Sequence, residues 1–162
     1  MNQQAVIAVA VAPIHRDPNF SSEMITQSLM WENVYIRETK NNWHLIQTED
    51  RYDGWIHAFY LSYCDVPISQ SIVISRRIIP VFQDIEDLNS IISILSFGTS
   101  VPIASQSGRF SKISFPNGQN GYIENQKKML DKSRNEILKL SKILLGTPYL
   151  WGGRSSFGYD CS

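Results

Sequence analysis

The first 125 residues alternate between apolar and polar positions in short runs, which is the period of half-buried β-strands. Turn-forming residues such as Asn41-Asn42 and Asn117-Gly118 separate these runs. The pattern predicts strands over residues 34–37, 43–48, 54–57, 101–104, 110–115 and 121–123. The apolar stretch 5–12 is also expected to be a strand, because it is too short to span a membrane and no basic residue precedes it, as a signal peptide requires.

The chain resembles itself at an offset of 67 residues. Gly54-Trp55-Ile56 recurs as Gly121-Tyr122-Ile123, since 121 − 54 = 67, and Trp43 recurs as Phe110. One further match, between residues 29 and 95, is 66 apart and predicts a one-residue insertion between the copies. A fixed offset indicates one supersecondary unit used twice. Several short strands in each copy predict two independent small β-barrels, with the recurring aromatic residues in their cores.

After residue 125 the period of the apolar positions changes from 2 to 3.6, which predicts a helix over about 127–145. Gly146 and Pro148 are expected to end it. The apolar stripe of this helix consists of Leu130, Ile137, Leu138, Leu140, Ile143 and Leu144.

Charge and composition exclude several classes of function. Lys+Arg and Asp+Glu number 15 each, so nothing favours nucleic acid or an anionic membrane as a partner. No Cys-x-x-Cys, His-x-x-x-His or phosphate-binding glycine loop occurs, and we expect no metal ion and no cofactor. Of the two cysteines, Cys64 is expected to have a packing role. The three histidines, His15, His44 and His57, are expected at the surface or along strands and not as a catalytic base, and the protein is expected to be cytoplasmic.

The last sixteen residues contain a specific motif. Segment 148–153 reads Pro-Tyr-Leu-Trp-Gly-Gly, and segment 158–162 reads Gly-Tyr-Asp-Cys-Ser. This pattern resembles the nucleophile segment of the NlpC/P60 cysteine peptidases. The resemblance implies that Cys161 is the nucleophile in the first turn of a helix, where partial positive charge and free N–H groups stabilise a thiolate. Asp160 and Ser162 then flank the sulfur with a carboxylate and a hydroxyl.

The two repeats resemble bacterial SH3 (SH3b) modules. In the first copy the matching residues are Leu29, Glu32, Val34, Trp43, Ile46 and Gly54-Trp55-Ile56. The second copy departs by using Phe110 and Tyr122 in place of the two tryptophans. The implied fold is mainly β. Two SH3b-like barrels, residues 1–66 and 67–125, precede the α-helical start of a truncated α+β, papain-like NlpC/P60 domain over residues 126–162.

This order of modules is similar to that of the murein-peptide recycling enzymes of the family. The resemblance implies a cysteine endopeptidase that hydrolyses the γ-D-Glu–L-diamino acid bond of murein peptides with a free N-terminal L-Ala. It also implies that Asp160, Glu32 and Tyr52 hold the amine, while Trp151 and Ser162 belong to the substrate pocket. For Glu32 and Tyr52, ordinary turn and surface roles are the alternative.

In this family the catalytic His follows the Cys, and no His follows Cys161. We therefore expect the N-terminal part of an enzyme, inactive when alone, because a thiolate needs a positioned base. The alternative is a non-catalytic pair of SH3b domains that binds a cell-wall peptide or a protein. The sequence does not define the position of the base, the preferred diamino acid or the oligomeric state.

Overall fold

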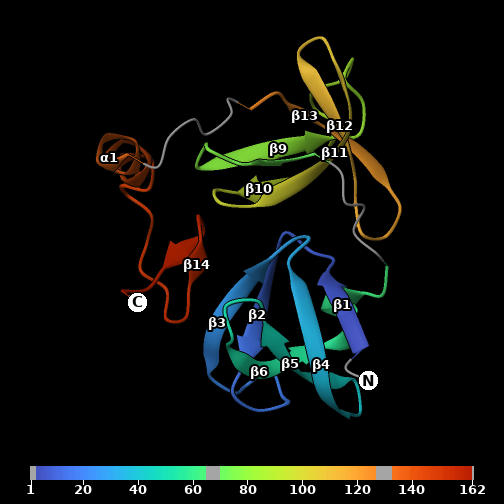
Figure 1. Ribbon diagram of the computed structural model, residues 1–162, viewed down its shortest axis with the longest axis vertical. Coiled ribbons are helices and arrows are strands. Elements are labelled where there is room, and N and C mark those ends of the chain that lie inside the picture. Colours follow the sequence, from blue (N-terminus) through green and yellow to red (C-terminus); the bar gives the residue numbers. More distant parts are fainter. Residues whose placement is uncertain (1–2, 65–69, 127–132, 162) are drawn as a thin grey trace.

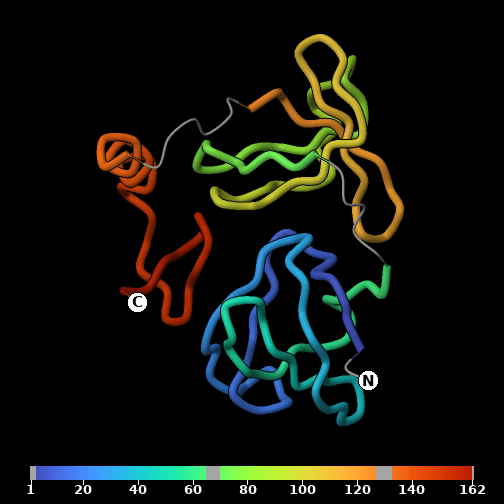
Figure 2. The backbone as a smooth tube through the Cα atoms, in the orientation of Figure 1, coloured from blue at the N-terminus to red at the C-terminus, as the bar shows by residue number. Residues whose placement is uncertain are grey.

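The computed structural model describes residues 3–64, 70–126 and 133–161. Two curled β-sheets lie one above the other, and a short helix and a β-hairpin lie along one side of the pair (Figure 1). We call the lower unit barrel 1 (residues 3–62) and the upper unit barrel 2 (residues 71–124). The path of the chain in Figure 2 passes through barrel 1, barrel 2 and the helix, and returns to barrel 1 at the hairpin.

The first six strands of barrel 1 correspond in order to the six described strands of barrel 2. Barrel 1 consists of β1 (Gln3–Ile7), β2 (Val11–His15), β3 (Met24–Leu29), β4 (Asn33–Lys40), β5 (Trp43–Thr48), β6 (Asp53–His57) and β7 (Leu61–Ser62), with a 3₁₀ turn at Ala58–Tyr60. Barrel 2 consists of β8 (Ser71–Val73), β9 (Ile78–Phe82), β10 (Ile91–Ser96), β11 (Ser100–Ser107), β12 (Phe110–Ser114) and β13 (Asn120–Glu124). The sheet orders are β3-β2-β6-β5-β4-β1-β7 and β10-β9-β13-β12-β11-β8, so the predicted strands and repeat are confirmed.

The offset of 67 holds through every equivalent strand from β2 to β6, and the predicted one-residue insertion is wrong. β3 and β10 begin at residues 24 and 91, and 91 − 24 = 67. The same β-bulge skips Ile25 in the first copy and Ile92 in the second. Leu95 therefore corresponds to Ser28. The sequence comparison had instead aligned Leu95 with Leu29, because both are leucines, although they occupy different positions in their strands; both are buried.

Three left-handed backbone positions also recur at this offset. In barrel 1 they are occupied by Trp31 (φ 68°), Asn41 (φ 54°) and Arg51 (φ 69°). Each residue 67 positions later is a glycine with positive φ, at 98, 108 and 118. Because side chains other than Gly are disfavoured in this region, their presence in barrel 1 indicates that tertiary contacts determine the backbone there.

Aliphatic side chains fill both cores at equivalent positions. The pairs Ile14/Val81, Val34/Val101, Ile36/Ile103, Ile46/Ile113 and Ile56/Ile123 are all buried. The prediction that the recurring aromatic residues fill the cores is largely wrong. Trp55 and Tyr122 are half-buried, because Gly54, Ile56 and their counterparts occupy the inward positions of these strands. Trp43 is buried, but against the rings of His15, Phe20 and His57.

The two barrels are not independent, which corrects a further expectation. Val6, Met30 and Trp31 of barrel 1 belong to the hydrophobic cluster of barrel 2. The Trp31 indole stacks on Phe115, with ring centroids 6.1 Å apart, and its Nε1 donates to the Ser114 carbonyl at 3.1 Å. The interface also includes Cys64, whose Sγ donates to the Pro116 carbonyl at 3.1 Å.

One local expectation for barrel 1 was also wrong. The stretch 5–12 forms parts of two strands, because β1 pairs with β4 and β7 whereas β2 pairs with β3 and β6. His15 and His44 are buried at the ends of the barrel. His44 bonds to Thr39 and Tyr63, so its burial is compensated by polar partners.

The helix α1 spans Arg134–Ile143 and begins at the N-cap Ser133. It ends at Leu144, and Gly146 follows in the left-handed conformation (φ 81°), as predicted. The earlier part of the predicted helix, residues 127–132, lies outside the described residues. No residue of α1 is buried, and Ile137 is 59% exposed. Among the described residues, no helix is long and apolar enough to cross a membrane.

The equivalence of the barrels predicts equal sensitivity at Gly54 and Gly121. A methyl group at Gly54 would overlap Ile14 Cγ2, and one at Gly121 would lie 2.6 Å from Val81 Cγ1, so both Gly→Ala substitutions force the inner strands apart. We expect each to lower the free energy of unfolding by about 1–3 kcal/mol, measured by urea denaturation.

Gly108→Asn is the matched control. Nothing lies within 4 Å of a Cβ at this position, and its counterpart Asn41 adopts nearly the same φ. We expect a change below about 0.5 kcal/mol for this surface substitution. A Gly121→Ala protein as stable as the wild type would contradict the equivalence.

Candidate active site

The C-terminal motif forms a tight hairpin, in which β14 (Arg154–Ser155) pairs with β15 (Gly158–Tyr159). The segment before it folds against β15, because Leu150 N–H donates to the Tyr159 carbonyl and Tyr159 N–H donates to the Pro148 carbonyl. Asp160 N–H donates to the Gly153 carbonyl at 3.1 Å and Cys161 follows directly. The nucleophile candidate is thus attached to a small unit with its own hydrogen bonds.

This hairpin lies directly on β3 of barrel 1 (Figure 1). Gly152 (φ 67°) makes the approach possible, because a Cβ there would lie 2.7 Å from the Met24 carbonyl oxygen. The neighbour that requires a glycine here is thus a strand of barrel 1. Trp151 Nε1 donates to Glu23 Oε1 at 2.9 Å, next to this contact.

Polar contacts join the hairpin to both barrels. Arg154 N–H donates to the Gln27 side-chain oxygen at 2.9 Å, and its guanidinium lies 3.2 Å from Glu32 Oε2. On the other side, Ser156 N–H donates to Ser96 Oγ of barrel 2 at 2.8 Å. The position of Cys161 therefore depends on both SH3-like units.

Cys161 is exposed and opens into a hollow of about 280 Å³ between the hairpin and barrel 1. This cysteine hollow is lined by Arg16, Glu23, Ile25, Tyr149, Trp151, Gly152, Asp160 and Cys161. Trp151 and Asp160, both predicted to contact the substrate, thus line the same hollow as Cys161. Glu23 was not predicted, because it lies in a β2–β3 loop whose approach to the hairpin leaves no signal in a sequence motif.

A second hollow of about 360 Å³ adjoins the first and shares Asp160 with it. Its lining includes Asp50, Tyr52 and Arg154, and Tyr52 is 48% exposed. The structure therefore brings the predicted residues Tyr52 and Asp160 to the same space. Two carboxylates and a phenol at adjoining hollows are groups that can bind a desolvated ammonium.

Glu32 occupies a different place from the other predicted residues. It lines a third hollow of about 300 Å³ with Glu49, Asp50 and Arg154, and it does not line the cysteine hollow. Its carboxylate accepts from Leu29 N–H at 3.1 Å and pairs with Arg154. Burial raises the pKa of Glu32 above its usual value, although the Arg154 charge and the Leu29 N–H oppose this effect.

The histidines of the chain are engaged away from the sulfur, since none of the three lines the cysteine hollow. His15 Nδ1 lies 3.0 Å from the Ser22 carbonyl, and His57 Nδ1 accepts from Phe59 N–H. Burial, and then the His57 charge, lower the pKa of His44. Ser162, the remaining predicted site residue, and the helix that the resemblance places after Cys161 lie outside the described residues.

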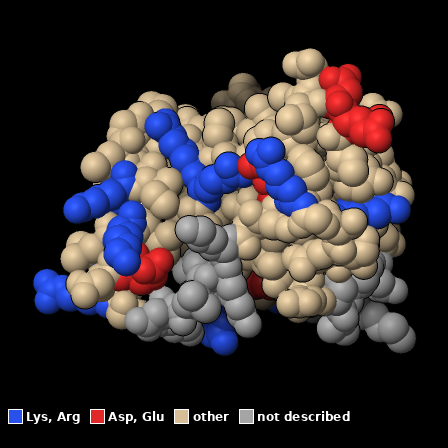
Figure 3. All heavy atoms as spheres, turned by 90° about the horizontal axis from the view of Figure 1, so that it is seen from above, with Lys and Arg blue, Asp and Glu red and all other residues tan. Residues whose placement is uncertain are grey.

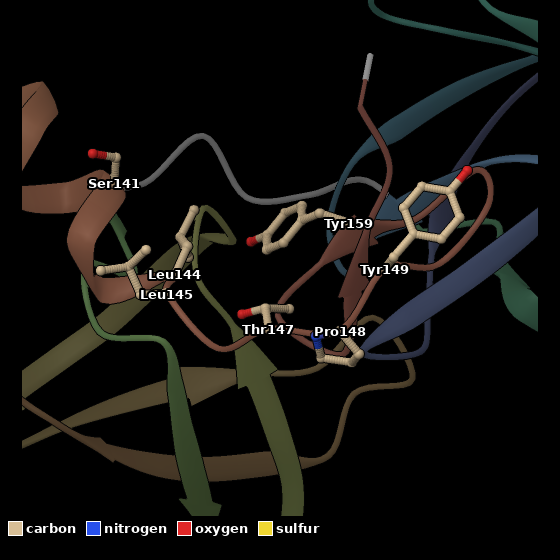
Figure 4. A pocket seen from close by; sticks show the side chains of 7 residues that line it. All are labelled: Ser141, Leu144, Leu145, Thr147, Pro148, Tyr149 and Tyr159. Carbon is tan, nitrogen blue, oxygen red and sulfur yellow. The ribbon is translucent and has the colours of Figure 1, made fainter.

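A fourth hollow, of about 400 Å³, separates α1 from the hairpin. In Figure 4 the Tyr159 ring points toward Leu144, whereas the Tyr149 ring extends to the opposite side of the hairpin. None of the predicted site residues lines this fourth hollow. Within the described residues, no three His, Cys, Asp or Glu side chains gather closely enough to hold a metal ion.

The face formed by barrel 2 and α1 is mostly neutral (Figure 3). Lys and Arg side chains are spread across it, and an Asp/Glu group occupies one edge. The two signs of charge are thus mixed on this face.

Comparison with known proteins gives consistent matches. Residues 14–58 match the family model described as the bacterial dipeptidyl-peptidase SH3 domain. The chain is 23% identical over 162 residues to a gamma-D-glutamyl-L-lysine dipeptidyl-peptidase of Bacillus cereus, covering 88% of the chain and 48% of that protein. It is 25% identical over 154 residues to the protein of the same name in Bacillus subtilis, covering 85% and 49%. The chain thus spans about half the length of these relatives.

Among solved structures, a crystal structure of an NlpC/P60 family protein from Bacillus cereus has the same fold, with a TM-score of 0.81 and 19% identity. The match covers 98% of this chain and 68% of that one. The resemblance to NlpC/P60 proteins with SH3b domains is confirmed. The expected fold, mainly β with SH3b-like barrels before the start of an NlpC/P60 domain, is confirmed as well.

The two carboxylates with shifted pKa values predict opposite pH dependences of stability. The pKa of Glu32 is raised by burial, so its stabilising contribution is complete below its usual value of 4.5 and is lost as the pH rises through the raised pKa. The pKa of Glu124 is lowered by hydrogen bonds from Arg76 and then Arg109. Its contribution is therefore present above 4.5 and is lost as the pH falls through the lowered pKa.

The measurement is urea denaturation of wild type, Glu32→Gln and Glu124→Gln between pH 3 and pH 7. Relative to wild type, Glu32→Gln should become more stable as the pH rises, and Glu124→Gln should become less stable. Differences that change in the same direction for both variants would contradict the assigned environments.

Proposed function

We propose that this chain supplies the nucleophile and the amine-binding surface of a cysteine endopeptidase. Its substrate is a murein peptide with a free N-terminal L-Ala, cut at the γ-D-Glu–L-diamino acid bond. The observation that carries the proposal is the position of Cys161 in a hollow that barrel 1 and the hairpin build together. The names of the Bacillus relatives, gamma-D-glutamyl-L-lysine dipeptidyl-peptidases, support the same bond.

In the proposed reaction the Cys161 thiolate attacks the γ-carbonyl carbon of D-Glu. The C–N bond breaks, the diamino acid leaves with a proton on its amine, and water releases the dipeptide from the sulfur. A base must take the thiol proton and return it to the leaving amine. Because His15 and His57 have partners elsewhere, we assign this base to the remainder of a complete peptidase domain.

The amine of L-Ala is proposed to bind between Glu23, Tyr52 and Asp160. Glu23 and Asp160 line the cysteine hollow, and Tyr52 reaches Asp160 through the adjoining one. Glu23 replaces Glu32 in this role, because Glu23 lines the cysteine hollow whereas Glu32 lines a separate one. Trp151, which is 61% exposed, supplies an apolar wall beside the amine.

Carboxylates at the amine suit short peptides that have already been cut from the glycan, since only these have a free L-Ala amine. We therefore place the enzyme in murein-peptide recycling in the cytoplasm. Binding of such a peptide without turnover by the complete protein would instead support the alternative, a non-catalytic binding module.

Hydrolysis is the first test of the proposal. A protein carrying this chain with a complete peptidase domain should release L-Ala-γ-D-Glu from L-Ala-γ-D-Glu-L-Lys or from the diaminopimelate analogue, followed by chromatography. Cys161→Ala should lower kcat by ~10³-fold or more, because the acyl-enzyme can no longer form. The 162-residue chain alone should show no turnover above its own Cys161→Ala control. Equal rates for the complete wild type and its Cys161→Ala variant would refute the proposed chemistry.

A second test concerns the amine. In the complete protein, Glu23→Gln should reduce the preference for free over N-acetylated L-Ala by roughly 30-fold, since losing one partner of a buried charge pair costs about 2 kcal/mol or more. The matched control is Glu38→Gln, at an exposed carboxylate of β4 that lines none of the hollows described here. If Glu23→Gln kept the full preference, Glu23 would not contact the amine.

A further inference from the structure

Arg154, at the first position of β14, is bound from three separate segments of barrel 1. Its N–H donates to Gln27 Oε1 at 2.9 Å, and its Nη1 donates to the Gln27 carbonyl at 3.3 Å on β3. The same Nη1 lies 3.2 Å from Glu32 Oε2 in the β3–β4 turn and 3.8 Å from Asp50 Oδ2 in the β5–β6 turn. One hairpin residue thus joins three parts of the barrel.

The partners of Arg154 have little freedom in the folded chain. Gln27 is only 8% exposed, and its side-chain oxygen is used for the Arg154 N–H. The Glu32 carboxylate is fixed by the Leu29 N–H. Side chains that are already ordered lose little entropy on forming these bonds, so the contacts specify one position of the hairpin.

The repeat shows that folding of the barrel does not require these partners. At the offset of 67, Gln27, Glu32 and Asp50 correspond to Ile94, Thr99 and Asn117. Barrel 2 reaches the same strand order with none of the three. The amide and the two carboxylates are therefore additions to the first copy, at the surface where the hairpin lies.

We propose that Arg154 is a positioning residue, which through Gln27, Glu32 and Asp50 keeps Cys161 and Asp160 at a defined distance from Glu23 and Tyr52. Arg154 lines the second and third hollows but not the cysteine hollow, so it acts through the hairpin and not on the sulfur itself. This inference rests on the proposed function, because the distance matters only if one peptide contacts both sides.

The test uses the 162-residue chain and the indole N–H signals of its tryptophans in ¹⁵N–¹H NMR spectra. Trp151 Nε1 bonds to Glu23 and reports the position of the hairpin, whereas Trp31 Nε1 bonds to Ser114 and reports the interface between the barrels. The variant is Arg154→Gln with Glu32→Gln, which removes the pair without leaving Glu32 as a buried, unpaired charge. The matched control is Arg76→Gln with Glu124→Gln, an ion pair of barrel 2.

The proposal expects the Trp151 signal to move toward that of an unbonded indole, with the Trp31 signal unchanged and neither signal moved in the control. An unmoved Trp151 signal overturns it. If the Trp31 signal also moves, Arg154→Lys decides, because the lysine side chain is one bond shorter and places no nitrogen at the position of Nη1, which contacts both Gln27 and Glu32. Movement of Trp151 alone in that variant supports the proposal, and any other result overturns it.

Titration with L-Ala-γ-D-Glu then links position to binding. The Arg154→Gln, Glu32→Gln variant should bind the dipeptide roughly tenfold more weakly than wild type, the size of an ordinary coupling between contacting groups. Unchanged binding despite a displaced Trp151 overturns the positioning role. If wild type does not bind the dipeptide, the proposed amine site fails, while the indole signals still report whether Arg154 holds the hairpin.

Discussion

The joint at Trp31 determines how the rest of the molecule is arranged. Its indole leaves barrel 1, stacks on Phe115 and donates to the Ser114 carbonyl of barrel 2. A left-handed backbone costs a residue other than glycine roughly 1–2 kcal/mol, and burial of an indole between two cores is large enough to offset this cost. The hairpin forms hydrogen bonds with Gln27 of barrel 1 and Ser96 of barrel 2. Both bonds can form only when the two barrels have the relative orientation that the Trp31 contacts maintain.

The two copies of the repeat have different tasks. Both use the same strand order, the same bulge and the same inward glycine, which are requirements of the barrel itself. Barrel 1 also places Glu23, Tyr52 and the Arg154 partners on the side facing the hairpin. Barrel 2 contributes Ser96, which binds the hairpin, and Phe115, on which Trp31 stacks. The repeat has thus duplicated a scaffold, and the chemistry belongs to one copy.

Sequence patterns predicted the features that depend on neighbouring positions. The offset of 67 located the strands because burial alternates along each of them, and the Gly-Tyr-Asp-Cys-Ser motif located the candidate nucleophile. The prediction failed where aliphatic and aromatic residues compete for the same core. Trp55 was expected inside, but the inward positions belong to Gly54 and Ile56.

Contacts through space were the other limit. A match to the SH3b pattern selected Glu32, whereas the barrel 1 carboxylate that lines the cysteine hollow is Glu23, which contacts a hairpin residue 128 positions later in the chain. No periodicity or local spacing encodes such a pair. Trp151 and Asp160 could be located because they are close to Cys161 along the chain as well as in space.

A hairpin held by two barrels also has a consequence for biosynthesis. Chains emerge from the ribosome N-terminus first, and domains fold as they appear. The barrel residues that bind the hairpin lie between residues 23 and 97, so they are synthesised before residue 154. Cys161 is therefore added only after both barrels are complete. Until the hairpin binds to both barrels, Cys161 lacks the neighbours that are proposed to select the substrate.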